Sequence, residues 1–275
     1  MRELDQEQAI AIRKIILQQF HEFCIKNDLK YAMGYGTLLG AIRHGGMIPW
    51  DDDIDLVMPR MDYERLCALF PDKNCKDRYQ FISHHNHPEV QTKIGYFIDY
   101  STVTETAGRK VDYHGIHIDV APMDFVPDGK WQRKWLFFKM KLARFIIKMK
   151  DLHPEILHGK QKLIRQMLQV IFAPFGTENA YKRLDKYAKT YMNLPEEQRK
   201  TVCCLVEPGR PVMFPYEVTK KYALYQYEGR EYLSYEDYDT PLKAWYGDYM
   251  TPPPADQQKR WPHTWVHYYS KDEDE

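Results

Sequence analysis

The sequence predicts a mixed α/β fold whose sheet core contains a helical insert. Three observations lead to this prediction. Residues 5–26 place apolar side chains three and four positions apart, as an amphipathic helix does. Segments such as 53–58 and 116–121 alternate apolar and polar residues, which is typical of strands. Between about residues 130 and 194 the apolar spacing becomes helical, so a block of helices is expected inside the chain.

The elements are expected in a simple order. Up to residue 58 we predict a helix over 5–26, a strand over 29–33, a helix from Thr37 to about 44, a loop through 45–49 and a strand over 53–58. A helix over 61–70 is then followed by strands over 79–83, 91–98 and 102–104, a turn over 112–115 and a strand over 116–121. Pro122 is expected to end that strand, since proline donates no ladder hydrogen bond.

Helices dominate the region that follows. We predict three helices, near 130–150, 160–173 and 178–192. After them we predict a strand over 201–206, a hairpin over 222–233 that turns at Glu228 and Gly229, a short helix over 236–246 and an irregular, proline-rich tail. We therefore divide the chain into a core over 1–128, a helical insert over 129–200 and a C-terminal part over 201–275 that completes the core.

Composition narrows the class of protein. The 275 residues carry 39 basic and 39 acidic side chains, a balance that gives no indication of nucleic-acid binding. The five cysteines form no C-x-x-C pair, which favours a reducing compartment and argues against structural zinc. The sequence begins without an apolar signal core and has no run long enough to span a bilayer. We expect a cytoplasmic protein, with peripheral contact at the inner face of the membrane as an open alternative.

The most informative stretch is the acidic segment that leads into strand 53–58. Because side chains alternate along a strand, Asp53 and Asp55 are expected on one face, with Ile54, Leu56 and Met58 on the other. Two carboxylates held side by side are costly unless a cation lies between them. Oxygen ligands favour Mg²⁺, with Mn²⁺ as the alternative.

A third carboxylate is expected from the strand over 116–121. Asp119 is the acid of that strand, and it shares the polar face with His117. Two-metal phosphoryl transfer requires at least three carboxylates, so we predict that Asp53, Asp55 and Asp119 converge. A calcium loop is excluded, since its sixth and twelfth positions would be Leu56 and Asp62 in place of glycine and glutamate.

Glycines precede the acidic segment. Gly36 and Thr37 begin a helix, and a helix N-terminus can bind a phosphate. A plain helix cap explains the same residues equally well. The glycines fit neither the dinucleotide fingerprint nor a Walker sequence.

At this point a family resemblance becomes specific. The chain resembles the LicD family of the nucleotidyltransferase superfamily, which also includes the fukutin-related sugar-phosphate transferases. The matching segments are 36–44 (GTLLGAIRH), 48–55 (IPWDDDID), 62–63 (DY), 115–124 (GIHIDVAPMD) and 246–250 (YGDYM) followed by two prolines. The cysteine zinc loop of the fukutin-related branch is absent from this sequence, which therefore resembles the bacterial-type branch.

The resemblance implies a nucleotidyltransferase-type mixed sheet core and a metal-dependent phosphotransferase. The donor is expected to be CDP-choline or a related CDP-alcohol, and the acceptor a hydroxyl of a cell-surface glycan, such as a teichoic acid or a lipid-linked sugar. It implies that Asp53, Asp55 and Asp119 are catalytic and bind Mg²⁺ or Mn²⁺. Gly36 and Thr37 would hold the diphosphate, and Arg43 and Lys93 would neutralise phosphate oxygens. Aromatic residues available for a choline cage are Tyr35, Trp50, Tyr96, Trp245 and Tyr246.

Two other functions stay open. In one, a nucleotidyltransferase moves NMP and releases pyrophosphate. In the other, the chain is a catalytically inactive protein that binds a nucleotide or glycan. The presence of all three carboxylates favours an enzyme, because a binding protein does not need them.

The segment over 129–170 is strongly basic, with eleven Lys and Arg against two acids. Tryptophan, phenylalanine and isoleucine residues lie among these bases. Such a segment over 130–150 is either an interfacial helix that contacts anionic lipid or a lid packed on the core with a basic outer face. Elsewhere, His84, His85 and His87 lie in a polar loop without a partner cluster in the sequence, so a metal site is not predicted there.

Overall fold

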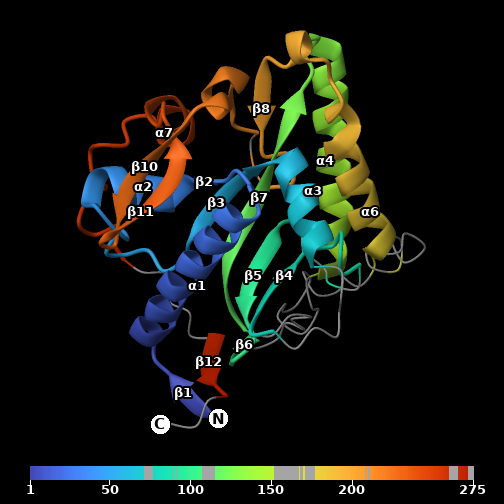
Figure 1. The fold of residues 1–275 in the computed structure, drawn as a ribbon. Coiled ribbons are helices and arrows are strands. Elements are labelled where there is room, and N and C mark those ends of the chain that lie inside the picture. The colour runs from blue at the N-terminus through green and yellow to red at the C-terminus, as the bar shows by residue number, and fades with distance from the viewer. Residues whose placement is uncertain are drawn as a thin grey trace.

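The structure is a computed structural model, and Figure 1 shows its fold. The residues that it describes are 1–70, 77–88, 90, 92–106, 115–151, 167, 170, 177–207, 209, 211–259 and 266–271. The predicted helix over 160–173 and the predicted turn over 112–115 lie almost wholly outside these residues.

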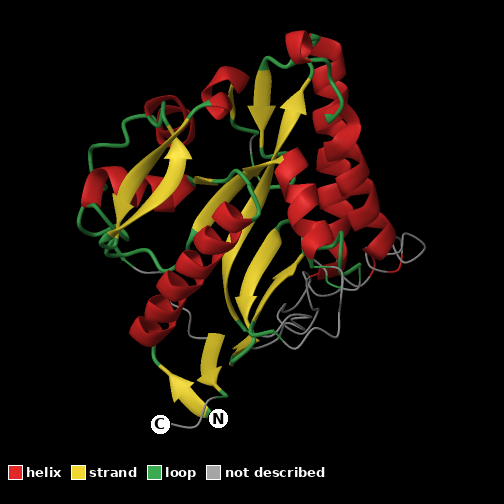
Figure 2. Ribbon diagram, viewed as in Figure 1, coloured by secondary structure: helices red, strands yellow, loops and turns green. Residues whose placement is uncertain are grey.

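A mixed sheet forms the centre of the molecule, as the sequence predicts (Figure 2). Its strands run in the order β2-β3-β7-β5-β4, and β8 and β9 extend it from the far end of β7. Their bounds are β2 Ala32–Met33, β3 Asp55–Pro59, β4 Tyr79–Ile82, β5 Gly95–Asp99, β7 Ile116–Val126, β8 Thr201–Cys203 and β9 Met213–Pro215. Strands β3 and β7 are parallel, whereas the other pairs are antiparallel.

Strand β7 runs through Pro122, so the expectation that this proline ends the strand is wrong. The N–H of Asp119 points toward β3, where it donates to the carbonyl of Ile54 at 2.9 Å. Because successive peptide groups alternate in direction, the missing N–H of Pro122 faces the β5 side. Strand β5 does not extend as far as Pro122, since the two strands are antiparallel and the first residue of β5, Gly95, pairs with Val120. The proline therefore costs no ladder hydrogen bond.

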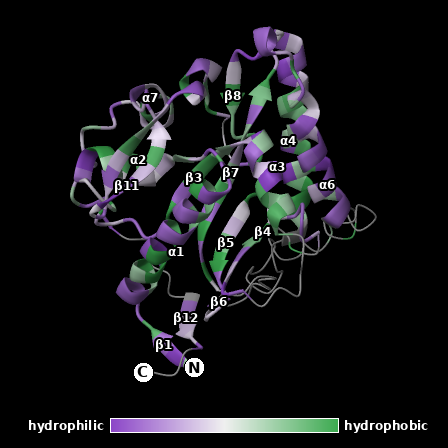
Figure 3. Ribbon diagram, viewed as in Figure 1, coloured by the Kyte–Doolittle hydropathy of each residue, from purple (hydrophilic) through white to green (hydrophobic). Residues whose placement is uncertain are grey.

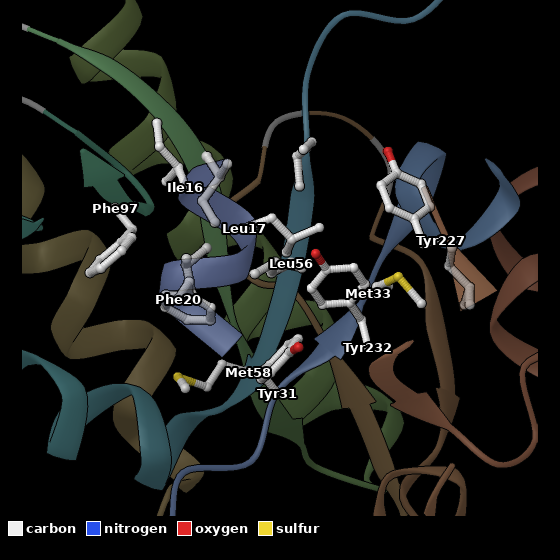
Figure 4. Packing of buried hydrophobic residues seen from close by; sticks show 14 of the residues in the cluster. Ile16, Leu17, Phe20, Tyr31, Met33, Leu56, Met58, Phe97, Tyr227 and Tyr232 are labelled. Carbon is white, nitrogen blue, oxygen red and sulfur yellow. The ribbon is translucent and has the colours of Figure 1, made fainter. Parts of the chain in front are cut away.

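Helix α1 (Gln6–Lys26) packs against one face of this sheet. Its start is fixed by a capping box, in which Asp5 accepts from the N–H of Gln8 and the Gln8 side chain accepts from the N–H of Asp5. Figure 4 shows Phe20 of this helix near Phe97 of β5, and their ring centroids lie 5.2 Å apart, edge to face. Ile54, Leu56 and Met58 are buried in this same core, which confirms the predicted apolar face.

Further helices lie around the sheet, with bounds α2 Tyr35–His44, α3 Arg60–Leu69, α4 Lys130–Asp151, α6 Thr177–Ala188 and α7 Asp239–Tyr246. Strand β7 carries mostly hydrophobic colours in Figure 3, since both of its faces are covered. Helices α4 and α6 cover a second core, which contains Met140, Ile147, Leu184 and the β7 residues Ala121 and Met123.

A charged cluster ties helix α6 to helix α3. His85 Nε2 lies 2.7 Å from Asp185, and its Nδ1 lies 3.1 Å from Glu64. The ammonium of Lys189 lies 2.9 Å from Glu64 and 3.0 Å from Asp185. Burial lowers the pKa of His85, but its contacts with both carboxylates raise it more. Of the loop histidines, His85 therefore has a partner cluster that the sequence does not reveal, and Lys189 and Arg60 supply positive charge to it.

The C-terminal part contains the predicted hairpin, formed by β10 (Tyr222–Tyr227) and β11 (Arg230–Tyr235). It also contains a strand that the sequence analysis missed. β12 (Val266–Ser270) lies between β1 (Arg2–Leu4) and β6 (Thr102–Thr106). The expectation of an irregular tail is thus wrong for these residues. The division of the chain at residues 128 and 200 stays a prediction. Among the described residues, no helix combines the length and hydropathy of a membrane span.

Candidate active site on strands β3 and β7

Two of the three predicted carboxylates are direct neighbours in the sheet. Asp55, the first residue of β3, pairs in register with Asp119 on the parallel strand β7. Residues that pair in register project to the same face of a sheet. The prediction that acids from two separate strands meet is therefore confirmed for this pair.

Asp53 takes a different place from the one predicted. Strand β3 begins at Asp55, so Asp53 lies in the preceding loop and does not share strand alternation with Asp55. Carboxylate oxygens of Asp51, Asp52 and Asp53 lie within 4.8 Å of one another. The loop therefore gathers its own acids beside the strand pair.

These negative charges raise one another's pKa values. Burial and the nearby Asp53 raise the pKa of Asp119 to about 7. The same two causes raise the pKa of Asp51 to about 7. Burial, Asp53 and Asp119 also raise the pKa of Asp55 well above its usual range. Crowded, partly desolvated carboxylates of this kind are stabilised by a bound cation.

Local hydrogen bonds hold Asp55 in place. The hydroxyl of Thr37 in α2 accepts the N–H of Asp55 at 2.8 Å, and the Asp55 carbonyl accepts the N–H of Gly34 at 3.0 Å. Thr37 is buried, with 2% of its surface exposed. A β-carbon at Gly36 would collide with the Asp51 carboxylate, so glycine lets this acid lie against the start of α2. The diphosphate-binding roles of Gly36 and Thr37 stay predictions.

The tip of the β10–β11 hairpin fixes the loop that precedes the acids. Glu228 accepts the N–H of Met47 at 2.8 Å and binds Lys14 of α1 at 2.7 Å. Its own N–H donates to Gly45 at 3.2 Å. The C-terminal part thus positions the acidic segment of the core.

Two residues that the sequence analysis missed, Glu207 and Arg13, act on the same charges. Glu207 raises the pKa of both Asp55 and Asp119 by its negative charge, in addition to the causes named above. The positive charge of Arg13 opposes that rise at Asp119. Among the described residues, Nη1 of this buried arginine has no hydrogen-bond partner, while Nη2 donates to Tyr268 at 3.0 Å. No local pattern marks Glu207 or Arg13, since both come from distant segments.

The charges of the acids also reach Tyr246, which the sequence analysis named for the choline cage. This tyrosine is 44% exposed. Burial and the charge of Asp55, followed by those of Asp51 and Asp53, raise the pKa of its phenol. The phenol therefore lies beside the carboxylates, at the start of the 246–250 motif.

Arg43 and Lys93 contact other parts of the molecule. Arg43 donates to the carbonyl of Tyr249 at 2.7 Å, so it links helix α2 to the C-terminal motif. Lys93 lines a small pocket with Tyr181 and Asp185 of α6, and the lining of that pocket includes none of the three predicted catalytic acids. Their phosphate-binding roles stay predictions.

His117 lies next to Asp119, as the alternation of β7 predicts. Its Nε2 is 3.7 Å from the carboxylate, and its Nδ1 donates to the carbonyl of Gly115 at 3.1 Å. Burial, with the charge of Arg13, lowers the pKa of His117 to about 4. The imidazole is therefore neutral at pH 7.

Comparison with known proteins decides the family. Residues 28–158 match the model of the nucleotidyltransferase domain of LicD, FKTN and FKRP. The chain is 27% identical over 271 residues to the lipopolysaccharide cholinephosphotransferase LicD of Haemophilus influenzae, an alignment that covers 93% of this chain and 94% of that one. The chain therefore contains a domain of the LicD family.

The matched domain includes Asp53, Asp55 and Asp119. Shorter similarities connect it to uncharacterized proteins of Rickettsia prowazekii, 43% identical over 56 residues, and of Rickettsia typhi, 42% identical over 68 residues. They cover 20% and 25% of this chain, and 21% and 22% of the respective relatives.

Proposed function

We propose that this protein transfers phosphocholine from CDP-choline to a hydroxyl of a glycan, with lipopolysaccharide as the acceptor class. The observation that carries the proposal is the register pair of Asp55 and Asp119 inside a LicD-type domain. The Haemophilus relative, which aligns along nearly the whole chain, is named as a lipopolysaccharide cholinephosphotransferase. A teichoic acid remains an alternative acceptor, since both are cell-surface glycans with free hydroxyls.

In the proposed reaction, the acceptor oxygen forms a bond to the phosphorus that bears choline. The bond from that phosphorus to the bridging oxygen breaks, and CMP leaves with the electron pair. The hydroxyl proton moves to a carboxylate, for which we propose Asp119. An ionised carboxylate can accept this proton, as a general base requires.

The donor atoms fit Mg²⁺. Asp53, Asp55 and Asp119 offer only carboxylate oxygens, the ligands that this ion prefers. The raised pKa values of Asp55 and Asp119 indicate excess negative charge, which a divalent ion neutralises. When bound, the ion would supply charge neutralisation at the diphosphate. Mn²⁺ suits the same ligands.

We further propose Tyr246 as part of the choline subsite. A quaternary ammonium binds to the faces of aromatic rings. Tyr246 is half exposed and lies next to the carboxylates, whereas Tyr35 and Trp245 pack on each other with ring centroids 4.4 Å apart. Trp50 lies near His44 and Arg43, and Tyr96 packs on His117.

The test has two arms. The first is a thermal-shift screen in Mg²⁺ with CDP-choline, CDP-ethanolamine, CDP-glycerol, CDP-ribitol, CTP and ATP. The second measures CMP release from CDP-choline in the presence of a lipopolysaccharide acceptor, for the wild type and for Asp55→Asn and Asp119→Asn. We expect selective stabilisation by CDP-choline, and a loss of at least about 1000-fold in CMP release for each variant.

Selective stabilisation by CTP or ATP, with release of pyrophosphate, would replace the proposal with nucleotidyl transfer. Unchanged CMP release in Asp55→Asn would contradict the proposal that Asp55 binds the metal ion. Binding of CDP-choline without any turnover, over a range of glycan acceptors, would favour an inactive binding protein.

A further inference from the structure

Helix α4 carries an exposed apolar stripe on the face opposite its packed side. The stripe, as we define it, consists of Trp131, Trp135, Phe138, Leu142 and Phe145. These residues follow one another at intervals of four, three, four and three, so they line one face of the helix. Their exposed fractions range from 43% to 80%.

The stripe is not part of the protein core. Leu136, Met140, Ala143 and Ile147 of the same helix are buried in the core that α4 forms with α6 and β7. This packed face is sufficient to hold the helix on the domain. Single exposed apolar residues are common, but five large ones in an unbroken row mark an interaction surface.

Positive charge borders the stripe. Lys134, Lys141 and Lys148 recur every seven residues along one flank, and all three are exposed. Lys139 lies on the other flank, with its ammonium 5.0 Å from the centre of the Tyr187 ring of α6. The Lys134 ammonium lies 4.9 Å from the centre of the Trp131 ring. No Asp or Glu occurs between residues 130 and 150.

The pattern favours one kind of partner. Tryptophan residues at an apolar boundary, flanked by lysines whose stems reach outward, are typical of helices that lie in the headgroup layer of a bilayer. Each exposed lysine near an anionic surface contributes about 1 kcal/mol, or roughly fivefold in binding. A protein partner would be expected to offer acids and apolar groups at fixed positions, whereas a bilayer requires only a planar boundary and negative charge.

We propose that the exposed face of α4 docks this protein on an anionic phospholipid surface. Both interpretations left open by the sequence are then partly correct, because one face of the helix packs as a lid and the other binds lipid. The inference goes beyond the proposed function, because it concerns attachment and does not depend on turnover. Docking would bring the enzyme to acceptors that are themselves held in the membrane.

The experiment is flotation of the purified full chain with phosphatidylcholine vesicles, with and without phosphatidylglycerol. The apolar variant is Trp131→Ala/Trp135→Ala, and its matched control is Ile15→Ala/Ile25→Ala, which removes exposed apolar residues from α1. The charge variant is Lys134→Glu/Lys141→Glu, and its control is Lys26→Glu/Lys221→Glu, which changes the net charge equally. Circular dichroism verifies that each variant is folded.

We expect binding to the anionic vesicles, weakened by salt, and a loss of at least about tenfold in each α4 variant. The two controls and Asp119→Asn should bind as the wild type does. Failure of the wild type to float, or equal losses in controls and α4 variants, would overturn the proposal. A dimer in solution that Trp131→Ala/Trp135→Ala dissociates would also overturn it, because a second copy would then cover the stripe.

Discussion

The hydroxyl of Thr37 accepts the backbone N–H of Asp55 at 2.8 Å, so helix α2 is tied to the first residue of strand β3, one of the three predicted catalytic acids. Both partners are largely shielded from water, and the threonine is buried. A bond in this place sets the position of the Asp55 carboxylate relative to Asp119.

Thr37→Val should remove the acceptor and leave the Asp55 N–H unsatisfied. We expect a loss of about 1–3 kcal/mol in the free energy of unfolding. We also expect a fall in kcat of about tenfold or more, with an unchanged KM for the donor, because the carboxylate moves. Thr37→Ser, which keeps the oxygen, is the control. An increased KM with unchanged kcat would instead indicate that Thr37 binds the diphosphate, as the family resemblance implies.

Asp119 should make the stability of the metal-free protein depend on pH. Its folded pKa, about 7, lies above the value near 3.9 of an unfolded aspartate. The protonated form is therefore favoured in the folded state, and its contribution is present below pH 3.9 and lost as the pH rises through 7. Because 29% of the side chain is exposed, we expect a loss on the order of 2 kcal/mol at pH 8.

Asp119→Asn tests this expectation in denaturant titrations with a chelator present. The variant should be more stable than the wild type at pH 8, and the two should differ little near pH 4. Addition of Mg²⁺ should raise the stability of the wild type and have little effect on the variant. Identical pH dependence of the two proteins would contradict the placement of Asp119 among the other acids.

Arg60 and Asp124 form a buried ion pair between α3 and β7. The guanidinium makes two hydrogen bonds to the carboxylate, at 2.7 and 2.9 Å, and each residue is 2% exposed. Arg60→Ala leaves the acid unpaired, for which we expect a loss of about 3–5 kcal/mol in the free energy of unfolding.

The control for this prediction is Arg65→Ala. Arg65 pairs with Asp62 at 2.8 Å but has an exposed side chain, so its removal should cost less than about 1 kcal/mol. Replacing both buried partners, in Arg60→Met/Asp124→Leu, should recover much of the stability. Equal losses of unfolding free energy for Arg60→Ala and Arg65→Ala would show that the buried ion pair matters no more to stability than the exposed one.

Tyr246→Ala should weaken the binding of CDP-choline, because the cation loses an aromatic face. We expect KM for CDP-choline to rise by about tenfold or more, and Tyr246→Phe to keep most of the affinity. Inhibition by CDP-glycerol, which carries no cation, should change little in either variant. A parallel rise for both nucleotides would assign Tyr246 to the nucleotide itself and not to choline.

Much of the site could be predicted because its key residues break strong local patterns. Asp119 is a lone acid in an apolar strand, Asp55 ends an acidic run that leads into another, and strand alternation correctly assigned the core residues around Asp55. The position of Asp53 could not be predicted, since β3 begins only at Asp55, where its pairing with the distant strand β7 begins. The expectation that Pro122 ends its strand was wrong because the proline would cost a hydrogen bond only if β5 extended alongside it, and β5 begins at Gly95, opposite Val120.

Contacts between distant segments account for the other omissions. Glu207 and Arg13 influence the acids from two separate parts of the chain, and no spacing rule relates them to the acids. Strand β12 was missed because its partners, β1 and β6, lie far from it in sequence.

The length of strand β7 affects how the native state opens locally. Residues 116–123 pair with the central strands, whereas Asp124–Val126 pair only with β8, beside the helical layer. One continuous strand therefore belongs to two regions that can open separately. Amide hydrogen exchange should be slowest at Ile118 and Val120 and markedly faster at Phe125, so the backbone around Asp119 keeps its structure when the helical layer fluctuates.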